Sequence, residues 1–147
     1  MTKRFYVDAC IWLNLFKKEG DPTKGVPYWK IARNFVNKII FSDDKEIVYT
    51  NYILKEIKFN INNERLYEER LKFIKGEPKI KFIKFEEKDF SFARELESRL
   101  NYEISFFDCL HIAITKRLNL ILVTRDKDLF IAAKKYVSVN KPEELIS

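Results

Sequence analysis

The sequence contains few of the residues on which common nucleotide-binding and hydrolytic sites depend. Its 147 residues include three glycines, two cysteines and one histidine. No Gly-x-x-x-x-Gly-Lys-Ser/Thr or Gly-x-Gly-x-x-Gly segment follows an apolar run, which argues against a phosphate-cradling loop. The single histidine, His111, lies near Phe107, Leu110 and Ile114. This setting predicts a core histidine, and it argues against Ser-His-Asp or Cys-His catalysis.

The cysteines and the length of the apolar runs indicate in which cellular compartment the protein is expected. Cys10 and Cys109 have no second Cys or His at metal-ligand spacing, so we expect buried, reduced thiols that act as small apolar residues. No run approaches the roughly 18 apolar residues that a membrane span needs. The first residues reach Asp8 too soon for a signal peptide. We therefore expect a cytoplasmic protein without membrane association.

The charge balance is basic, with 28 Lys and Arg against 22 Asp and Glu, a net charge of +6. This excess is compatible with an anionic partner such as nucleic acid, and equally with a solvated, lysine-rich surface. Five lysines could attract a nucleic-acid backbone if they share one face. They are Lys55, Lys58, Lys79, Lys81 and Lys84.

Residues 1–147 suit a single domain. Short β-like runs occur at Arg4–Val7, Glu46–Tyr49, Lys79–Phe85, Asn119–Val123 and Tyr136–Val139. Helical periodicity occupies Tyr28–Ile40, Asn51–Lys75, Asp89–Leu100 and Ser105–Arg117, with Gly76 and Pro78 ending the second of these. Strands that alternate with helices predict right-handed crossovers. The fold class is therefore α/β, a three-layer α/β/α arrangement with a central, mostly parallel sheet of about five strands.

Carboxylates stand where such a fold binds ligands, outside the carboxyl ends of its strands. Singly, each acid has a simple explanation as a helix cap or a solvated side chain. Together they would repel one another, and a shared crevice would require protons or a cation. An all-oxygen set suits Mg²⁺ or Mn²⁺. The acids are Asp8, Glu56, Asp108, Asp126 and Asp128. Whether they converge depends on the strand order, which periodicity does not supply.

Four segments resemble, in order, the motifs of the PIN-domain family, of which the small VapC-type toxins are the best-known group. They are Phe5–Leu13, Ile53–Ile57, Phe106–Ala113 and Leu122–Leu129. The resemblance implies that Asp8, Glu56, Asp108 and Asp126 are the metal-binding, catalytic acids of a Mg²⁺- or Mn²⁺-dependent endoribonuclease. One departure is Cys10, where such proteins often carry Ser or Thr, which could alter a supporting hydrogen bond.

Residues around the fourth acid are candidates for supporting roles. Thr124 could hydrogen-bond near Asp126, although a simple strand-end threonine explains it as well. Asp128 suits support of the metal ligands or helix capping better than direct ligation. Arg125 and Lys127 flank Asp126 and could contact RNA phosphates, while a solvated turn is the alternative.

The resemblance also implies a homodimer and an antitoxin protein that covers the crevice. Outward-facing aromatics among Tyr52, Phe59, Tyr67 and Phe73 would support such contacts, and core packing is the alternative. Two other functions stay open. One is a phosphoryl-accepting receiver-like domain, which would need an acid pair where Asp8-Ala9 offers one acid. The other is a PIN-like nucleic-acid-binding or scaffold module without catalysis.

Overall fold

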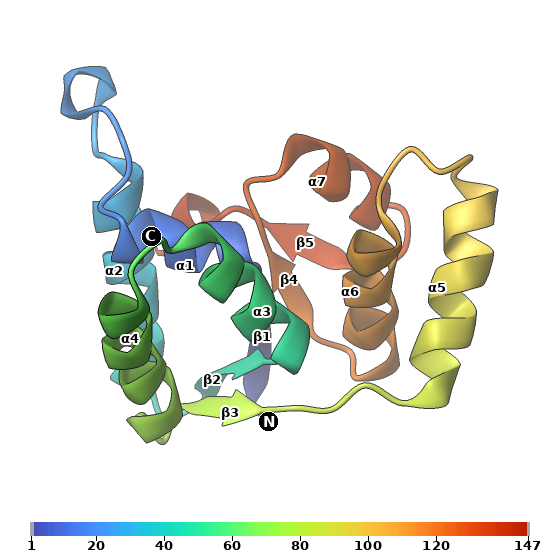
Figure 1. The fold of residues 1–147 in the computed structure, drawn as a ribbon, viewed down its shortest axis with the longest axis horizontal. Coiled ribbons are helices and arrows are strands. Elements are labelled where there is room, and N and C mark those ends of the chain that lie inside the picture. The colour runs from blue at the N-terminus through green and yellow to red at the C-terminus, as the bar shows by residue number, and fades with distance from the viewer. Residues whose placement is uncertain (1, 147) are drawn as a thin grey trace.

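Five short parallel strands form the centre of the computed structural model, which describes residues 2–146 (Figure 1). The strand order is β3-β2-β1-β4-β5. The strands are β1 (Lys3–Val7), β2 (Lys45–Tyr49), β3 (Ile80–Phe82), β4 (Ile121–Val123) and β5 (Ser138–Asn140). All four strand pairings are parallel. The predicted fold class is therefore confirmed.

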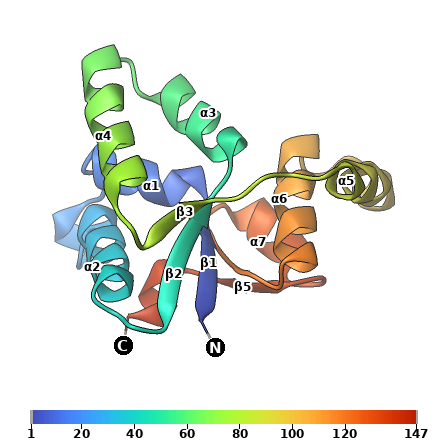
Figure 2. The same ribbon diagram turned by 90° about the horizontal axis from the view of Figure 1, so that it is seen from below.

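Helices cover both faces of the sheet. The helices are α1 (Ala9–Phe16), α2 (Tyr28–Ile40), α3 (Asn51–Asn60), α4 (Glu64–Gly76), α5 (Glu87–Arg99), α6 (Phe106–Arg117) and α7 (Lys127–Ala133), with 3₁₀ turns η1 (Pro22–Lys24) and η2 (Pro142–Leu145). Helices α1 to α4 lie on one face and α5 to α7 on the other (Figures 1 and 2). Right-handed crossovers explain this division, because the chain moves outward from β1 to β3 and then returns through β4 to β5.

The central strand β1 is continuously apolar in its second half because helices cover both of its faces. Phe5, Tyr6 and Val7 are all buried, as expected for a strand that is covered on both faces. The ring of Phe5 meets Phe35 of α2 at 5.7 Å between centroids. Tyr6 points to the opposite layer, where its ring lies 5.4 Å from that of His111 in α6.

The Asn51–Lys75 region is two helices, so the prediction of one continuous helix was wrong. Helix α3 ends at Asn60, and Ile61 turns extended and inserts its side chain into the core. Asn63 then starts α4, because its side chain accepts a hydrogen bond from the Leu66 amide. Gly76 is the last residue of α4 and has no positive φ, so it is not the glycine C-cap that the sequence suggested.

Strands β1 and β2 each begin one residue before their predicted start, and the other three strands differ from their predicted bounds by two residues or more. The Lys79–Phe85 run forms only the three-residue β3. Asn119 and Leu120, the first residues of the Asn119–Val123 run, form the turn that closes the end of α6, since the Leu120 amide donates to the carbonyl of Thr115. The last strand begins at Ser138, two residues later than predicted. Among the described residues, no helix is both long and apolar enough to cross a bilayer.

Candidate active site

Asp8 stands at the carboxyl end of the central strand and is 6% exposed. The register pairs Val7 with Val123, so Asp8 lies beside Thr124, the residue that follows the neighbouring strand β4. Oδ1 of Asp8 accepts a hydrogen bond from the Ala9 amide at 2.8 Å and thereby caps α1. Oδ2 accepts one from the Thr124 hydroxyl at 2.7 Å. The carboxylate is therefore held by the start of α1 and by the residue that follows β4.

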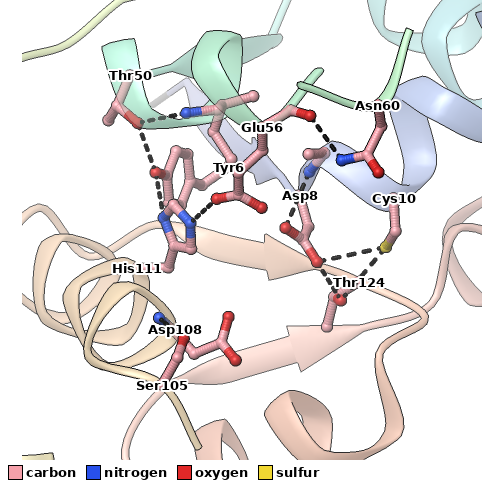
Figure 3. A network of polar contacts seen from close by, with 12 residues as sticks. Tyr6, Asp8, Cys10, Thr50, Glu56, Asn60, Ser105, Asp108, His111 and Thr124 are labelled. Atoms are coloured by element: carbon pink, nitrogen blue, oxygen red, sulfur yellow. Dashed lines mark hydrogen bonds and ion pairs between the residues drawn. The ribbon is translucent and has the colours of Figure 1, made fainter. Parts of the chain in front are cut away.

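Cys10 also contacts Asp8, with its thiol donating to Oδ2 at 3.3 Å (Figure 3). Its Sγ is 3.6 Å from Oγ1 of Thr124. Burial, reinforced by the charge of Asp8, raises the pKa of Cys10 to about 12. The thiol therefore stays protonated and occupies the position of a hydroxyl donor. Cys109 is buried as predicted, whereas Cys10 is half-buried and makes polar contacts, at the position where the family resemblance suggested an altered hydrogen bond.

Glu56 reaches the same place from the second turn of α3. Its Oε1 lies 2.8 Å from Nε2 of His111 on α6, so the two layers of helices meet above the edge of the sheet (Figure 3). His111 is 1% exposed, in agreement with the prediction of a buried histidine. Its ring is nevertheless part of a polar network, which the core interpretation missed.

The other nitrogen of His111 is also engaged. Nδ1 lies 2.6 Å from the Tyr6 hydroxyl, which in turn lies 2.8 Å from the Thr50 hydroxyl (Figure 3). Burial raises the pKa of Tyr6 well above 10, so its hydroxyl keeps its proton. With a neutral imidazole, Thr50 donates to Tyr6, Tyr6 donates to Nδ1, and Nε2–H donates to Glu56; with a protonated ring, Nδ1–H donates to Tyr6 and Tyr6 to Thr50, and Nε2–H still donates to Glu56. This chain fixes the orientation of the Glu56 carboxylate.

Asp8 and Asp108 lie in an environment that disfavours their charged forms. Burial raises the pKa of Asp8, with a smaller upward contribution from Glu56. Burial raises the pKa of Asp108 to about 6; the charge of His111 opposes this, and Asp8, Asp126 and Glu56 add to it. For His111, burial lowers the pKa, but Glu56, Asp8 and Asp108 together raise it above the ordinary value. Such a cluster is stabilised by protons or by a cation.

The four predicted acids converge on one edge of the sheet, but not equally closely. Asp8, Glu56 and His111 each offer one ligand atom within 4.8 Å of the others. Asp108 lies in the first turn of α6, where Oγ of Ser105 accepts a hydrogen bond from its amide. Asp126 is exposed, and its Oδ1 caps α7 through the amides of Asp128 and Leu129.

The closest group therefore includes a ring nitrogen, whereas the sequence suggested an all-oxygen set. His111 is nevertheless not available as a ligand in this arrangement, because Tyr6 and Glu56 occupy both of its nitrogens. The oxygen donors remain the candidates for a hard cation. The sequence signal for Asp8, Glu56 and Asp126 was a position soon after a strand end, and the signal for Asp108 was its place in the first turn of a helix. The signal for His111 was its place three residues after Asp108, on the same face of a helix.

The predicted supporting residues have different surroundings. Thr124 contacts Asp8 and also accepts a hydrogen bond from the Asp126 amide at 3.0 Å. Lys127 is exposed at the first position of α7. The side chain of Asp128 lines a different hollow, which it shares with Leu100 and Ile131. Asp128 lies in the first turn of α7, two residues after Asp126, which caps this helix.

Arg125 is committed to other parts of the chain. Its guanidinium forms an ion pair with Glu143 of η2 at 2.8 Å and lies 4.0 Å above the ring of Tyr28. The side chain is 12% exposed. The suggested RNA contact therefore finds no support in this geometry, since the guanidinium already has protein partners.

The five candidate lysines do not share one face. The ammonium of Lys79 donates to the carbonyl of Ser42, and that of Lys81 pairs with Glu46 at 2.8 Å. Both contacts lie towards the amino end of β2. Lys55, in contrast, lines the same hollow as Glu56.

A parallel sheet with carboxylates gathered at its carboxyl edge is the architecture that the sequence resemblance implied. Residues 5–135 match the PIN domain, and the chain belongs to the PIN-domain family. No curated protein sequence matches the chain significantly. Family membership and the strand order exclude the receiver-like alternative, whose sheet has the order 2-1-3-4-5.

Several solved structures share this fold at low sequence identity. VapBC2 from Rickettsia felis bound to a promoter DNA fragment has a TM-score of 0.69 at 15% identity, over 94% of this chain and 98% of that one. VapC20 from Mycobacterium tuberculosis, described as a sarcin-ricin loop cleaving toxin, has a TM-score of 0.67 at 18% identity, over 92% of this chain and 98% of that one. PAE2754 from Pyrobaculum aerophilum has a TM-score of 0.62 at 13% identity, over 99% of this chain and 94% of that one.

Proposed function

We propose that this protein is a metal-dependent endoribonuclease that hydrolyses RNA phosphodiester bonds. The observation that carries the proposal is that the buried Asp8 carboxylate lies close to Glu56 and Asp108. Burial of each side chain raises the pKa of Asp8 and of Asp108, and the charges of the neighbouring acids add to it. An uncompensated set of this kind is unfavourable, and a divalent cation would relieve it. Similarity in fold to a toxin described as cleaving the sarcin-ricin loop supports RNA as the substrate.

The donor set fits Mg²⁺ or Mn²⁺, which prefer carboxylate oxygens. Asp8, Glu56, Asp108 and Asp126 are the proposed metal-binding and catalytic acids. A bound ion of this kind lowers the pKa of a water and neutralises charge that develops on the phosphate. Thr124 and Cys10 hold Asp8, while His111 holds Glu56, so the carboxylates keep their positions without substrate.

Lys127 is the proposed RNA contact of this region. It is exposed and follows Asp126 directly, so its ammonium can reach a phosphate next to the one that the acids address. Arg125 is left out of this role because of its ion pair with Glu143.

A metal-dependence assay on mixed RNA tests the proposal. The purified protein should cleave RNA with Mg²⁺ or Mn²⁺, lose this activity with EDTA, and regain it when excess Mn²⁺ is added. The alternative, a PIN-like binding or scaffold module, predicts RNA binding with no cleavage under any of these conditions. Cleavage that survives exhaustive chelation would contradict the metal-dependent mechanism.

We also propose that the protein is the toxin of a toxin–antitoxin pair and forms a homodimer. Support comes from the fold shared with a VapBC2 complex and with a toxin–antitoxin complex from Klebsiella pneumoniae. Phe59 and Phe73 are 86% and 40% exposed, so some of the predicted outward aromatics are present. Sedimentation at micromolar concentration should show a dimer, and a single monomer species would contradict this part of the proposal.

A further inference from the structure

An aromatic hollow adjoins the acids between α3 and the start of α6. We define it by Tyr52, Lys55, Phe59 and Phe107, and its volume is about 450 Å³. Glu56 and Asp108 belong to the same lining. The hollow is therefore continuous with the candidate active site.

Two aromatic rings of the hollow are exposed to solvent, although burial of such rings would stabilise the fold. Phe59 is 86% exposed in the last turn of α3, and Phe107 is 48% exposed in the first turn of α6. Phe107 is held against Tyr52, with ring centroids 5.1 Å apart, and Tyr52 is supported from behind by Phe85 at 5.4 Å. Two of the rings thus form a fixed wall with an open face.

The charges around the hollow suit one kind of ligand. The ammonium of Lys55 lies 5.0 Å from the ring centre of Tyr52 and supplies a positive charge at the rim. Glu56 and Asp108 supply carboxylates on the side of the active site. A purely apolar protein surface would desolvate these acids at a cost. A nucleotide instead offers a flat base that can stack on the aromatic rings and a phosphate that can pair with the ammonium of Lys55.

We propose that the aromatic hollow binds an unpaired nucleobase next to the phosphate that is cleaved. This inference rests on the proposed ribonuclease function and adds to it a base-binding site at Tyr52, Phe59 and Phe107. A base can stack on Tyr52 or Phe107 only when it is free of its duplex partner. Stacking accepts any base, so the hollow selects for an unpaired nucleotide more than for sequence.

Binding of a short single-stranded RNA to the Asp8→Asn protein tests this inference, because this variant separates binding from cleavage. Phe107→Ala and Phe59→Ala should each weaken binding by about five- to 150-fold, the range measured for loss of one stacked base. Phe107→Tyr should restore it. Phe41→Ala is the matched control, since Phe41 is 84% exposed and follows α2, on a segment distant from the hollow.

RNAs that carry an abasic site at successive positions complete the experiment. At one position, loss of the base should weaken binding to the parent Asp8→Asn protein and have no further effect on Phe107→Ala. Equal losses for Phe107→Ala and Phe41→Ala, or an effect of Phe107→Ala that persists with every abasic RNA, would overturn the inference.

Two further outcomes separate this inference from its alternatives. If Phe59→Ala dissociates a protein dimer and leaves RNA affinity unchanged, the hollow is a protein contact and the inference is wrong. If the wild-type protein cleaves RNA with Mn²⁺ but the Phe variants bind as the parent does, the inference fails while the proposed function stands. Position-specific binding without any cleavage would support the hollow and contradict the nuclease.

Discussion

His111 Nε2 and Glu56 Oε1 lie 2.8 Å apart and join the two helical layers above the carboxyl edge of the sheet. Because Tyr6 contacts the other ring nitrogen, the imidazole has one preferred orientation and holds Glu56 towards Asp8. Partners of this kind around metal ligands typically contribute 10- to 100-fold to metal affinity.

Removal of the His111 donor should therefore weaken metal binding. We expect His111→Leu to lower the affinity for Mn²⁺ by about 10- to 100-fold, and His111→Gln, whose amide can still donate to Glu56, to lower it much less. Titration calorimetry with Mn²⁺ measures both. Equal affinities of the Leu variant and the wild-type protein would show that His111 only fills the core.

Acidification should stabilise the metal-free protein through Asp108. Its pKa is about 6 in the folded protein against an ordinary value of 3.8. Between these values the folded state holds a proton that the unfolded state releases, so the free energy of unfolding falls as the pH rises. At pH 7, Asp108→Asn should raise this free energy by about 1–2 kcal/mol, less than the full shift implies because the group is partly exposed.

Urea unfolding in EDTA, at pH values from 4 to 7.5, measures this effect. The advantage of Asp108→Asn over the wild-type protein should be largest at pH 7 and above and should become small near pH 4, where Asp108 is protonated in the folded state and about half protonated in the unfolded state. A difference that does not change with pH would mean that Asp108 is not strained by its neighbours.

Lys127 should contribute one phosphate contact. Each neutralised phosphate of single-stranded RNA contributes roughly −0.7 to the slope of log affinity against log salt. Lys127→Gln should make the slope shallower by about this amount without affecting Mn²⁺ binding. Titration of an Asp108→Asn background with labelled RNA at several salt concentrations measures it. Lys134→Gln, at the end of α7, is the control and should leave the slope unchanged.

Arg125 should act on stability instead. Arg125→Ala removes the ion pair with Glu143 and the contact with Tyr28, and we expect it to lower the free energy of unfolding by about 1 kcal/mol. The salt dependence of RNA binding should not change. If the slope of log affinity against log salt became as shallow for Arg125→Ala as for Lys127→Gln, Arg125 would contact RNA and this prediction would be wrong.

The fold class was predictable from the sequence, and the positions of Asp8 and Asp126 were too, because strand ends and helix caps leave local signals; their role as metal ligands stays a prediction. Asp8 caps α1 and Asp126 caps α7, so a capping role and a position in the site coincide in the same side chain. The convergence of the acids was not predictable from periodicity. It follows from the strand order, which places β1 between β2 and β4.

What the sequence could not supply are partners that are distant along the chain. The burial of His111 was evident from its apolar neighbours, but its bond to Glu56 joins residues 55 positions apart. The ion pair of Arg125 depends on where η2 returns to the sheet. The break between α3 and α4 had a local signal, Asn63, which was hidden inside a continuous helical pattern.

The most direct test of the central claim compares Asp8→Asn with Asp43→Asn. Asp8 is 6% exposed within the cluster, whereas Asp43 is exposed in the turn before β2. With Mn²⁺ and mixed RNA, we predict that Asp8→Asn abolishes cleavage and keeps the circular dichroism spectrum of the wild-type protein, while Asp43→Asn cleaves normally. An Asp8→Asn protein that cleaves RNA at the wild-type rate would contradict the assignment of this cluster as the active site.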